Sequence, residues 1–288
     1  MPVVLTVESI GYLVPRYRFD GSVQSVYRRA CNISCGESLL TVTAPDVPDG
    51  PTALRLAGGQ PIDLRTCFRS RDPVSRCGSW LTSPRAIIDL GRAGTWNPEA
   101  LREIAALPEL LDNLRLAAER LRERCRPARS VVHREGHVVC VQLTRACRRH
   151  DLKTATADAA RLIGWGEGLT PAGDDFLVGL LAGLEALVRS SMSRRTFLAR
   201  FSDAIVARLA ATTVIAAHAL RLAAQGHFNA DLHRLRNALL RRTGVGPLRR
   251  SMEDVLAAGD TSGSDLCAGL LSGMSAWIDT RSTAAGSR

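Results

Sequence analysis

Two adjacent carboxylates, Asp174 and Asp175, follow a glycine-rich stretch and open an apolar run. The stretch from Gly164 to Leu184 reads G-W-G-E-G-L-T-P-A-G-D-D-F-L-V-G-L-L-A-G-L. Glycine lets backbone N–H groups approach a ligand, and the first four N–H groups of a helix have no partner within it. Because the helix start also carries a partial positive charge, such a loop-to-helix junction can bind an anion. The stretch therefore indicates where a functional site lies.

The same pattern occurs a second time near the end of the chain. Residues 172–184 align without gaps with residues 262–274, S-G-S-D-L-C-A-G-L-L-S-G-M. Small residues four positions apart on a helix allow two backbones to approach closely, so we expect the two apolar segments to pack together. That packing would bring Asp175 and Asp265 toward one cleft. The matched glycines are Gly173 with Gly263, Gly179 with Gly269, and Gly183 with Gly273.

A paired junction of this kind suggests anion binding together with carboxylate chemistry. Backbone N–H groups and hydroxyls would hold a phosphate or carboxylate, while the aspartates would hold Mg²⁺ or orient an attacking amine. The alternative is that the aspartates are only helix caps, although a cap needs neither the glycine cluster nor the repetition. The candidate catalytic residues are Asp175, Asp265 and Asp174. The candidate substrate-binding residues are Gly166, Gly168, Thr170, Gly173, Thr261, Ser262, Gly263 and Ser264.

Other familiar chemical motifs are weaker or absent. The G-W-G-E-G spacing differs from the dinucleotide-binding fingerprint and follows a helical pattern rather than a strand, and no Walker-type phosphate loop is present. His133 and His137 fall on opposite arms of a predicted hairpin and could share a metal ion, but strand histidines more often pack or hydrogen-bond. The eight cysteines lack a C-x-x-C pair, so free thiols are expected rather than a zinc site.

The residues that precede the glycine-rich site fall into two regions. Residues 1–96 contain short apolar or alternating runs separated by turn residues, which predicts an antiparallel β barrel or sandwich. From Asn97 the period becomes helical, with Pro98 in a first helical turn. Residues 97–288 are therefore predicted to be mainly α-helical, with a small hairpin near 130–143 turned at Glu135–Gly136. The predicted fold class is α+β, and the duplicated glycine and aspartate loop-helix motif lies in the helical domain.

Helix boundaries in the second region follow from capping residues. A helix through Ala155 to Ile163 stops at Gly164, and the next begins at about Asp174. Ser193 is predicted to cap a later helix, and Asn229 another. Further helices are predicted from Thr212 or Thr213 to Gly226 and from Pro247 to Gly259.

Charge and hydropathy narrow the expected partners. A formal charge of +10 raises the question of nucleic-acid binding, but Lys153 is the only lysine, the arginines are spread along the chain, and aromatic residues are just 5%. These features argue against a groove that stacks bases. The longest apolar run, 176–188, is too short for a bilayer and contains Glu185. No signal peptide is evident, so we expect a cytoplasmic protein without membrane segments.

The two quoted stretches resemble the paired signature of the AllH-like family, long catalogued as a domain of unknown function. G-E-G-L-T-P-A-G-D-D-F-L-V-G-L-L matches the first signature, and G-D-T-S-G-S-D-L-C-A-G-L-L matches the shorter second one. Bacterial members include the AllH subunit of an oxamate carbamoyltransferase in allantoin catabolism, a part of purine degradation. The resemblance spans most of the chain. It carries over Gly168, Thr170, Gly173, Asp174 and Asp175 from the first signature and Ser262, Gly263 and Asp265 from the second.

This resemblance implies a carbamoyltransferase subunit, hence a transferase of one-carbon groups within a larger complex. The implied substrates are carbamoyl phosphate and oxamate, or oxalurate in the catabolic direction, with partner subunits supplying part of the site. Relative to the family pattern, Ala172 replaces a serine, Glu167 a frequent proline, and Asp260–Thr261 a His-Ser pair. The lost hydroxyl and the added carboxylate could alter the preferred anion. The alternative is a noncatalytic metabolite-binding or assembly subunit.

Overall fold

The computed structural model describes residues 1–36, 38–58, 62–100, 105–124, 136–188, 191–242, 244–259 and 261–278. The chain splits into two compact units, Met1–Ala100 and Leu101–Arg288. The first unit is built of strands and the second of helices, so the predicted α+β class is confirmed. Within the described residues, no helix is long and apolar enough to cross a membrane.

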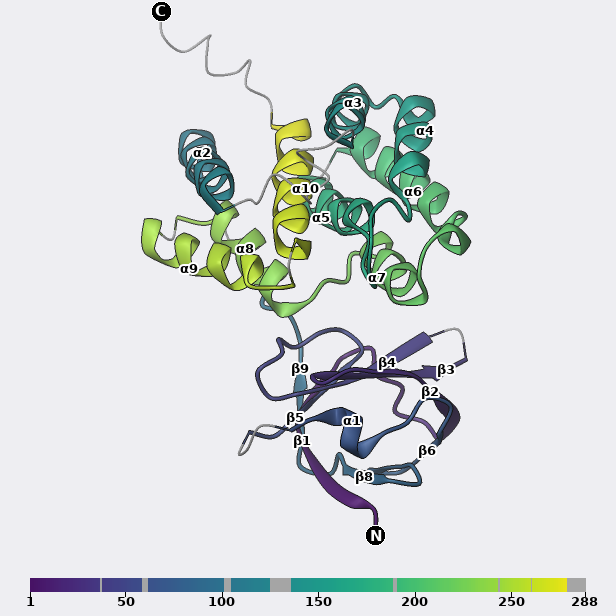
Figure 1. The fold of residues 1–288 in the computed structure, drawn as a ribbon. Helices are drawn as coiled ribbons and strands as arrows, with labels where there is room; N and C mark the ends of the chain where they lie inside the picture. Colours follow the sequence, from purple (N-terminus) through teal and green to yellow (C-terminus); the bar gives the residue numbers. More distant parts are fainter. Residues whose placement is uncertain are drawn as a thin grey trace, which may run out of the picture. The chain divides into compact units, whose positions relative to one another are not determined.

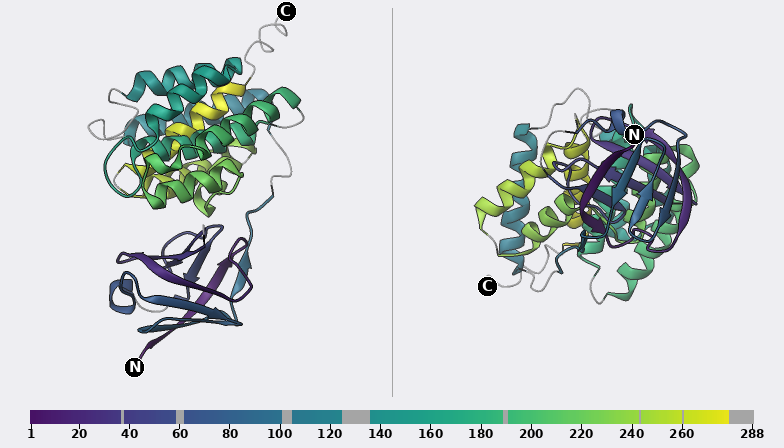
Figure 2. Two further views of the ribbon diagram at one scale, coloured as in Figure 1. Left: turned by 90° about the vertical axis from the view of Figure 1, so that its right-hand side faces the viewer. Right: turned by 90° about the horizontal axis from the view of Figure 1, so that it is seen from below.

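The first unit is a β barrel. Its strands in chain order are β1 (Val3–Gly11), β2 (Phe19–Val26), β3 (Ala30–Cys35), β4 (Ser38–Thr43), β5 (Ala53–Leu56), β6 (Pro73–Cys77), β7 (Trp80–Thr82), β8 (Ala86–Asp89) and β9 (Gly94–Trp96), with one helical turn, α1 (Leu64–Cys67), between β5 and β6. They pair in the order β5-β4-β3-β2-β6-β7-β8-β1-β9. An additional pairing of β5 with β1 closes the ring. Figure 2 shows these strands curving around a common interior.

The barrel is mixed rather than wholly antiparallel, which corrects the sequence-based expectation. β1 runs parallel to both β8 and β9, and β4 runs parallel to β5. The remaining pairs are antiparallel. Parallel partners need a crossover connection, which short strand runs do not reveal. The interior is filled by alternate residues of the strands, including Val7, Ile33, Val42, Leu54 and Ile88, all at most 2% exposed.

The second unit packs its helices around one hydrophobic core. Figure 1 shows these helices, with α10 in yellow beside α5. Their bounds are α2 (Leu107–Arg124), α3 (Gly136–Arg149), α4 (Leu152–Leu162), α5 (Ala172–Ala186), α6 (Met192–Val206), α7 (Val214–Ala224), α8 (Ala230–Leu240), α9 (Val245–Leu256) and α10 (Ser262–Trp277), with a 3-10 turn, η2 (Leu209–Ala211), before α7.

Capping residues fix several of these boundaries. The Thr213 hydroxyl accepts a hydrogen bond from the Ala216 N–H, and the Asn229 side chain accepts one from the Leu232 N–H, so both predicted helix starts are confirmed. α6 is capped by Ser191 rather than by the predicted Ser193. The predicted helix at Asn97 is wrong for residues 97–100, which are not helical.

The predicted hairpin near 130–143 is wrong for its second arm, because residues 136–143 belong to α3. The β-branched character of H-V-V-C-V favours a strand locally, but Val139, Cys140 and Leu143, followed by Ala146 and Cys147, recur at helical spacing and are buried. Packing of that face decides the conformation. His137 therefore lies on a helix. Residues 130–135, with the turn residue Glu135 and His133, lie outside the described residues.

α5 and α10 pack backbone against backbone, as the repeated glycines predict. A Cβ placed on Gly179 would lie 2.1 Å from the Leu266 carbonyl oxygen, and one on Gly269 would lie 2.0 Å from the Phe176 carbonyl oxygen. One turn later, Gly183 faces the Leu270 oxygen and Gly273 faces the Leu180 oxygen, each at 2.3 Å. Any side chain at these four positions would separate the helices. The reciprocal contacts show that the two copies are related by an approximate twofold axis.

The same relation extends to the helices around this pair. Gly173 at the start of α5 lies against the end of α4, where an added Cβ would be 2.0 Å from the Leu162 oxygen. Gly263 at the start of α10 lies in the same way against the end of α9, 2.1 Å from the Val255 oxygen. Farther along, α3 packs on α10 and α8 packs on α5. The duplicated unit is thus α3–α4–α5 followed by α8–α9–α10.

Candidate functional site

The first junction is a turn whose shape depends on glycine. Gly164, Gly166 and Gly168 have φ angles of +74°, +116° and +92°, a region that other residues avoid. Two of them also face backbone, since a Cβ on Gly164 would lie 2.4 Å from the Ala211 oxygen and one on Gly166 would lie 2.7 Å from the Ala172 nitrogen. Gly168 faces open space. The turn from Gly166 to Leu169 is exposed, and it leads into the half-buried Thr170.

The N–H groups at the start of α5 are mostly engaged within the loop. The Gly173 N–H donates to the Trp165 carbonyl at 2.9 Å, and the Asp174 and Asp175 N–H groups donate to the Pro171 carbonyl. By contrast, the amides of Gly166, Gly168 and Thr170 donate to none of the described residues. An anion at this junction would therefore meet the exposed turn rather than the helix end itself, which refines the sequence-based picture.

Thr170 and Ser262 join the two junctions. Their hydroxyl oxygens lie 3.0 Å apart, although the residues are 92 positions apart in the chain. Both hydroxyls also lie close enough to the Asp175 carboxyl group to lower its pKa. The predicted meeting of the two copies is therefore realised in three side chains: Asp175 and Thr170 from the first, and Ser262 from the second.

Asp175 is a buried carboxyl group at the meeting point of the two junctions. It is 8% exposed, and its Oδ2 atom has no hydrogen-bond partner among the described residues. Burial raises its pKa to about 8, and repulsion from Asp265 adds to the shift, while Ser262 and Thr170 oppose it. The raised pKa favours the protonated form of Asp175 at neutral pH. Asp265 is fully buried and lies close enough to Asp175 for the two carboxyl groups to interact electrostatically.

Asp174 has a different environment from its neighbour. Its Oδ1 atom accepts a hydrogen bond from the Gly164 N–H at 3.0 Å, and its Oδ2 atom accepts one from the Thr212 hydroxyl. It is 1% exposed. Burial raises its pKa against both of these hydrogen bonds. The Asp174 side chain thereby fastens the glycine turn to the segment before α7, which is a positioning role.

The second junction repeats part of this design with a shorter loop. The Gly263 N–H donates to the Ala258 carbonyl at 3.0 Å, as Gly173 does to Trp165. Thr261 and Ser264 are half-buried beside Ser262, whereas Asp260 lies outside the described residues. Gly173 and Gly263, both predicted to bind substrate, lie against backbone at the ends of α4 and α9. Their position explains why glycine is needed there without any ligand.

Thr212 and Thr213 belong to the site but were not predicted as site residues. Thr212 binds Asp174, and the Thr213 hydroxyl donates to the Leu169 carbonyl, so together they hold the exposed turn against the start of α7. The sequence identified these threonines only as a helix start. Their pairing with a loop about forty residues earlier has no local signal.

The described residues contain no group of three or more His, Cys, Asp or Glu side chains placed to hold a metal ion. The raised pKa of Asp175 favours its protonated form at neutral pH, and Asp174 is already hydrogen-bonded through both oxygens. The Mg²⁺ considered from the sequence would therefore have to compete with these protons and hydrogen bonds.

Comparison with known proteins places this geometry in a family. Residues 162–274, which include both junctions, match the family model described as oxamate carbamoyltransferase subunit AllH. Residues 8–95, which form the barrel, match the AllH family N-terminal domain. No solved structure matches the chain. The two matched segments cover the barrel and both copies of the glycine and aspartate junction in the expected order, and the chain therefore belongs to the AllH-like family.

Proposed function

We propose that this chain is a subunit of an oxamate carbamoyltransferase-like complex. In this proposal the exposed turn from Gly166 to Leu169, together with the half-buried Thr170 and Ser262, binds the phosphate of carbamoyl phosphate or the carboxylate of a small substrate. The family description supports the subunit role. The observation that carries the proposed site is the cluster of Thr170, Ser262 and Asp175, which joins the two copies at the residue directly after the exposed turn.

Carbamoyl transfer needs groups that stabilise the negative charge of the departing phosphate and groups that transfer protons. The oxamate nitrogen attacks the carbonyl carbon of carbamoyl phosphate, the carbon–oxygen bond to phosphate breaks, and the nitrogen loses a proton. The free amides of the turn can hold the departing phosphate. Asp175, whose raised pKa favours the protonated form at neutral pH, can pass its proton to that phosphate through Thr170 or Ser262 and take up the proton that the oxamate nitrogen loses, so it ends the step protonated again. In the catabolic direction, phosphate attacks oxalurate and the same groups act in reverse.

Burial of the carboxylates favours one alternative. Asp265 is fully buried and Asp175 nearly so, so neither carboxyl group offers a large surface to a substrate. A noncatalytic subunit that binds a metabolite or assists assembly would use the turn and the hydroxyls alone. The two functions differ in whether Asp175 changes turnover or only the stability of the turn.

We place the complex in the cytoplasm and in allantoin catabolism, one branch of purine degradation. The cysteines that the structure describes are free thiols, which suits a reducing compartment. Other subunits of the complex are the expected protein partners, and the site is completed in their presence. Neither a membrane nor nucleic acid is needed.

A calorimetric titration tests the binding site. Purified chain, alone and with its partner subunits, is titrated with carbamoyl phosphate, oxamate and oxalurate, with and without Mg²⁺. We expect Ser262→Ala and Thr170→Val to weaken binding at least tenfold, about 1.4 kcal/mol, because each removes a hydroxyl beneath the turn. Ser193→Ala, an exposed serine on α6, serves as the matched control and should bind like wild type.

Turnover of the assembled complex separates the two functions. Asp175→Asn preserves the shape of the side chain but removes the transferable proton, so a catalytic subunit should lose carbamoyl transfer while keeping substrate affinity. Unchanged turnover in that variant would favour the noncatalytic role. If none of the three ligands binds even in the complex, the anion site itself is wrong.

A further inference from the structure

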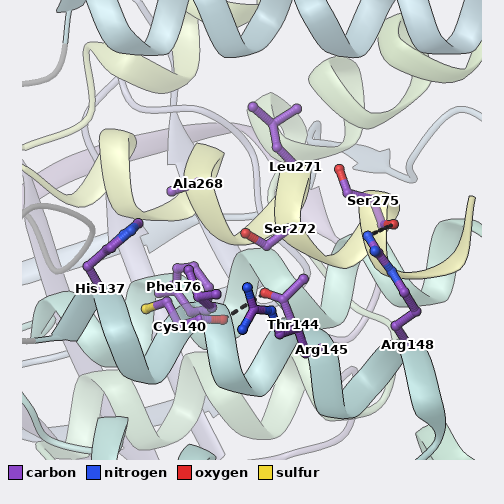
Figure 3. A pocket seen from close by; sticks show the side chains of 11 residues that line it. His137, Cys140, Thr144, Arg145, Arg148, Phe176, Ala268, Leu271, Ser272 and Ser275 are labelled. Atoms are coloured by element: carbon purple, nitrogen blue, oxygen red, sulfur yellow. Dashed lines mark hydrogen bonds between the residues drawn. The ribbon is translucent and has the colours of Figure 1, made fainter.

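A cavity of about 330 Å³ lies between α3 and α10, and no role has yet been assigned to it. Figure 3 shows Arg145 and Arg148 extending from α3 toward Ser272 and Ser275 on α10. Phe176 of α5 forms part of the wall. The volume of the cavity is at the low end of the roughly 300–1,000 Å³ typical of small-molecule sites. The cavity therefore suits a metabolite rather than a peptide or nucleic acid.

The charge of this cavity is unbalanced. Its lining contains two arginines and His137 but no aspartate or glutamate. Arg148 donates a hydrogen bond to the Ser275 carbonyl at 2.9 Å, and Arg145 has no ion pair or hydrogen bond with any described residue. Guanidinium groups pair readily with carboxylates in two-point geometry. Two arginines three positions apart on one helix face can therefore hold two anionic groups of one ligand.

The α8–α5 contact is the duplicated counterpart of the α3–α10 contact, and it contains a carboxylate that pairs with its arginine. In the other copy, Arg236 of α8 forms an ion pair with Glu185 of α5. When the alignment of α5 with α10 is continued, Ser275 is the residue equivalent to Glu185, and Ser272 is the residue equivalent to Ala182. The α8–α5 contact thus neutralises its arginine internally. Among the described residues no carboxylate lies at the equivalent place between α3 and α10, where Ser272 and Ser275 lie beside Arg145 and Arg148, and neither arginine has an ion pair within that part of the chain.

We infer that the α3–α10 cavity binds a small organic dianion of the dicarboxylate class. One carboxylate contacts the Arg145 guanidinium and the other lies at Arg148 and Ser275, while the carbon chain rests against Phe176 and Leu271. The site is separate from the glycine turn and does not depend on the proposed function.

The cavity nevertheless borders the carboxylate pair. Phe176 directly follows Asp175, and Cys140 in the cavity wall is close enough to Asp265 that the two groups interact electrostatically. A dianion bound here would sit near the groups that set the protonation of Asp175.

Titration of the full-length chain with succinate as the probe tests this inference. We expect saturable binding, at least tenfold weaker in Arg145→Gln, whose side chain has no structural partner to lose among the described residues. Arg149→Gln, an exposed arginine on the same helix outside the cavity, should stay within twofold of wild type. Ser275→Glu, which restores the carboxylate found at Glu185, should abolish binding while the protein remains folded by circular dichroism.

Three results would overturn the inference. Succinamide, the neutral analogue, binding as well as succinate would remove the role of charge. Equal effects of Arg145→Gln and Arg149→Gln would show only general attraction to a basic surface. Absence of saturable succinate binding, or tighter binding of inorganic phosphate than of succinate, would exclude the dicarboxylate class.

Discussion

Asp175 and Asp174 are neighbours in sequence, but their surroundings assign them different tasks. Asp174 directs both oxygens into the protein framework, to the Gly164 N–H and the Thr212 hydroxyl. Asp175 lies beside the Thr170 and Ser262 hydroxyls, which lower its pKa, and its buried Oδ2 atom has no hydrogen-bond partner among the described residues. A buried, incompletely bonded carboxyl group favours its neutral form. Functional candidates are thus distinguished by what each oxygen contacts rather than by residue type.

The raised pKa of Asp175 predicts a loss of stability as pH increases. The pKa is 3.8 in the unfolded reference and about 8 in the folded chain, so the folded state binds more protons between these values. Its contribution is therefore fully present below about pH 4 and is lost as pH rises to 8. Half-buried His218 and buried His233, with pKa lowered to about 4, act oppositely below pH 6.5. The effect of Asp175 on stability is therefore best separated from that of the histidines between pH 6.5 and 8.

Urea unfolding across that window measures the effect. Wild type should lose about 1–2 kcal/mol between pH 6.5 and 8, since one pKa unit corresponds to about 1.4 kcal/mol. Asp175→Asn, which resembles the protonated acid, should lose much less. Asp203→Asn, at an exposed position on α6, should follow wild type. Parallel pH profiles for wild type and Asp175→Asn would show that Asp175 is ionised throughout.

At the scale of elements, the contact between α5 and α10 determines where the site forms. The four glycines in their interface allow carbonyl oxygens of one helix to reach the positions of side chains on the other. Close approach of the two backbones also brings the two helix starts together, which is what places Ser262 3.0 Å from Thr170. The site is therefore a consequence of the packing and is sensitive to it.

Alanine substitution at the interface tests this dependence. In Gly269→Ala the new methyl group would lie 2.0 Å from the Phe176 oxygen, so the helices must separate. We expect a loss of about 1–3 kcal/mol in unfolding free energy, the usual cost of overpacking, together with weaker ligand binding at the glycine turn. Gly246→Ala is the control, because that helical glycine has only a flexible Arg250 atom nearby, at 3.9 Å. It should be neutral or slightly stabilising. Equal costs at both positions would disprove the packing argument.

Local sequence patterns were sufficient to predict some helices and contacts but not others. Caps such as Thr213 and Asn229 are encoded within one turn of the chain, and they could be predicted. The repeated glycines predicted the α5–α10 contact because each copy carries its half of the pattern. The conformation of 136–143 could not be predicted in this way, since Val139 and Leu143 become helical through burial against other helices.

Prediction of the site has the same limit. Residue types in the two signatures identified Thr170, Ser262 and Asp175, which the structure brings together. They could not show that Trp165 and Pro171 already accept the helix-start N–H groups, because that depends on the path of the loop. The cavity between α3 and α10 could not be predicted from the sequence either, because its lining combines side chains from three separate helices.

At the scale of the whole molecule, the chain contains two separate hydrophobic cores. The barrel core is drawn from Leu5 to Leu90 and the helical core from Leu110 to Trp277. Every strand pairing of the barrel lies within residues 3–96. A unit that contains its own core and its own backbone hydrogen bonds has what independent folding requires. The barrel therefore does not need the helical unit to satisfy its sheet.

We accordingly predict that a fragment of residues 1–100 folds by itself. It should show a β-type circular dichroism spectrum and one cooperative thermal transition. A fragment of residues 12–100 is the matched control, because it lacks β1, the strand that pairs with β5, β8 and β9 and closes the ring. Without β1 the barrel has open edges and loses core residues such as Val7 and Ile10, so this fragment should remain unfolded. If the longer fragment also fails to show a transition, the barrel requires the rest of the chain; if both fragments fold, β1 is not the closing strand on which the barrel depends.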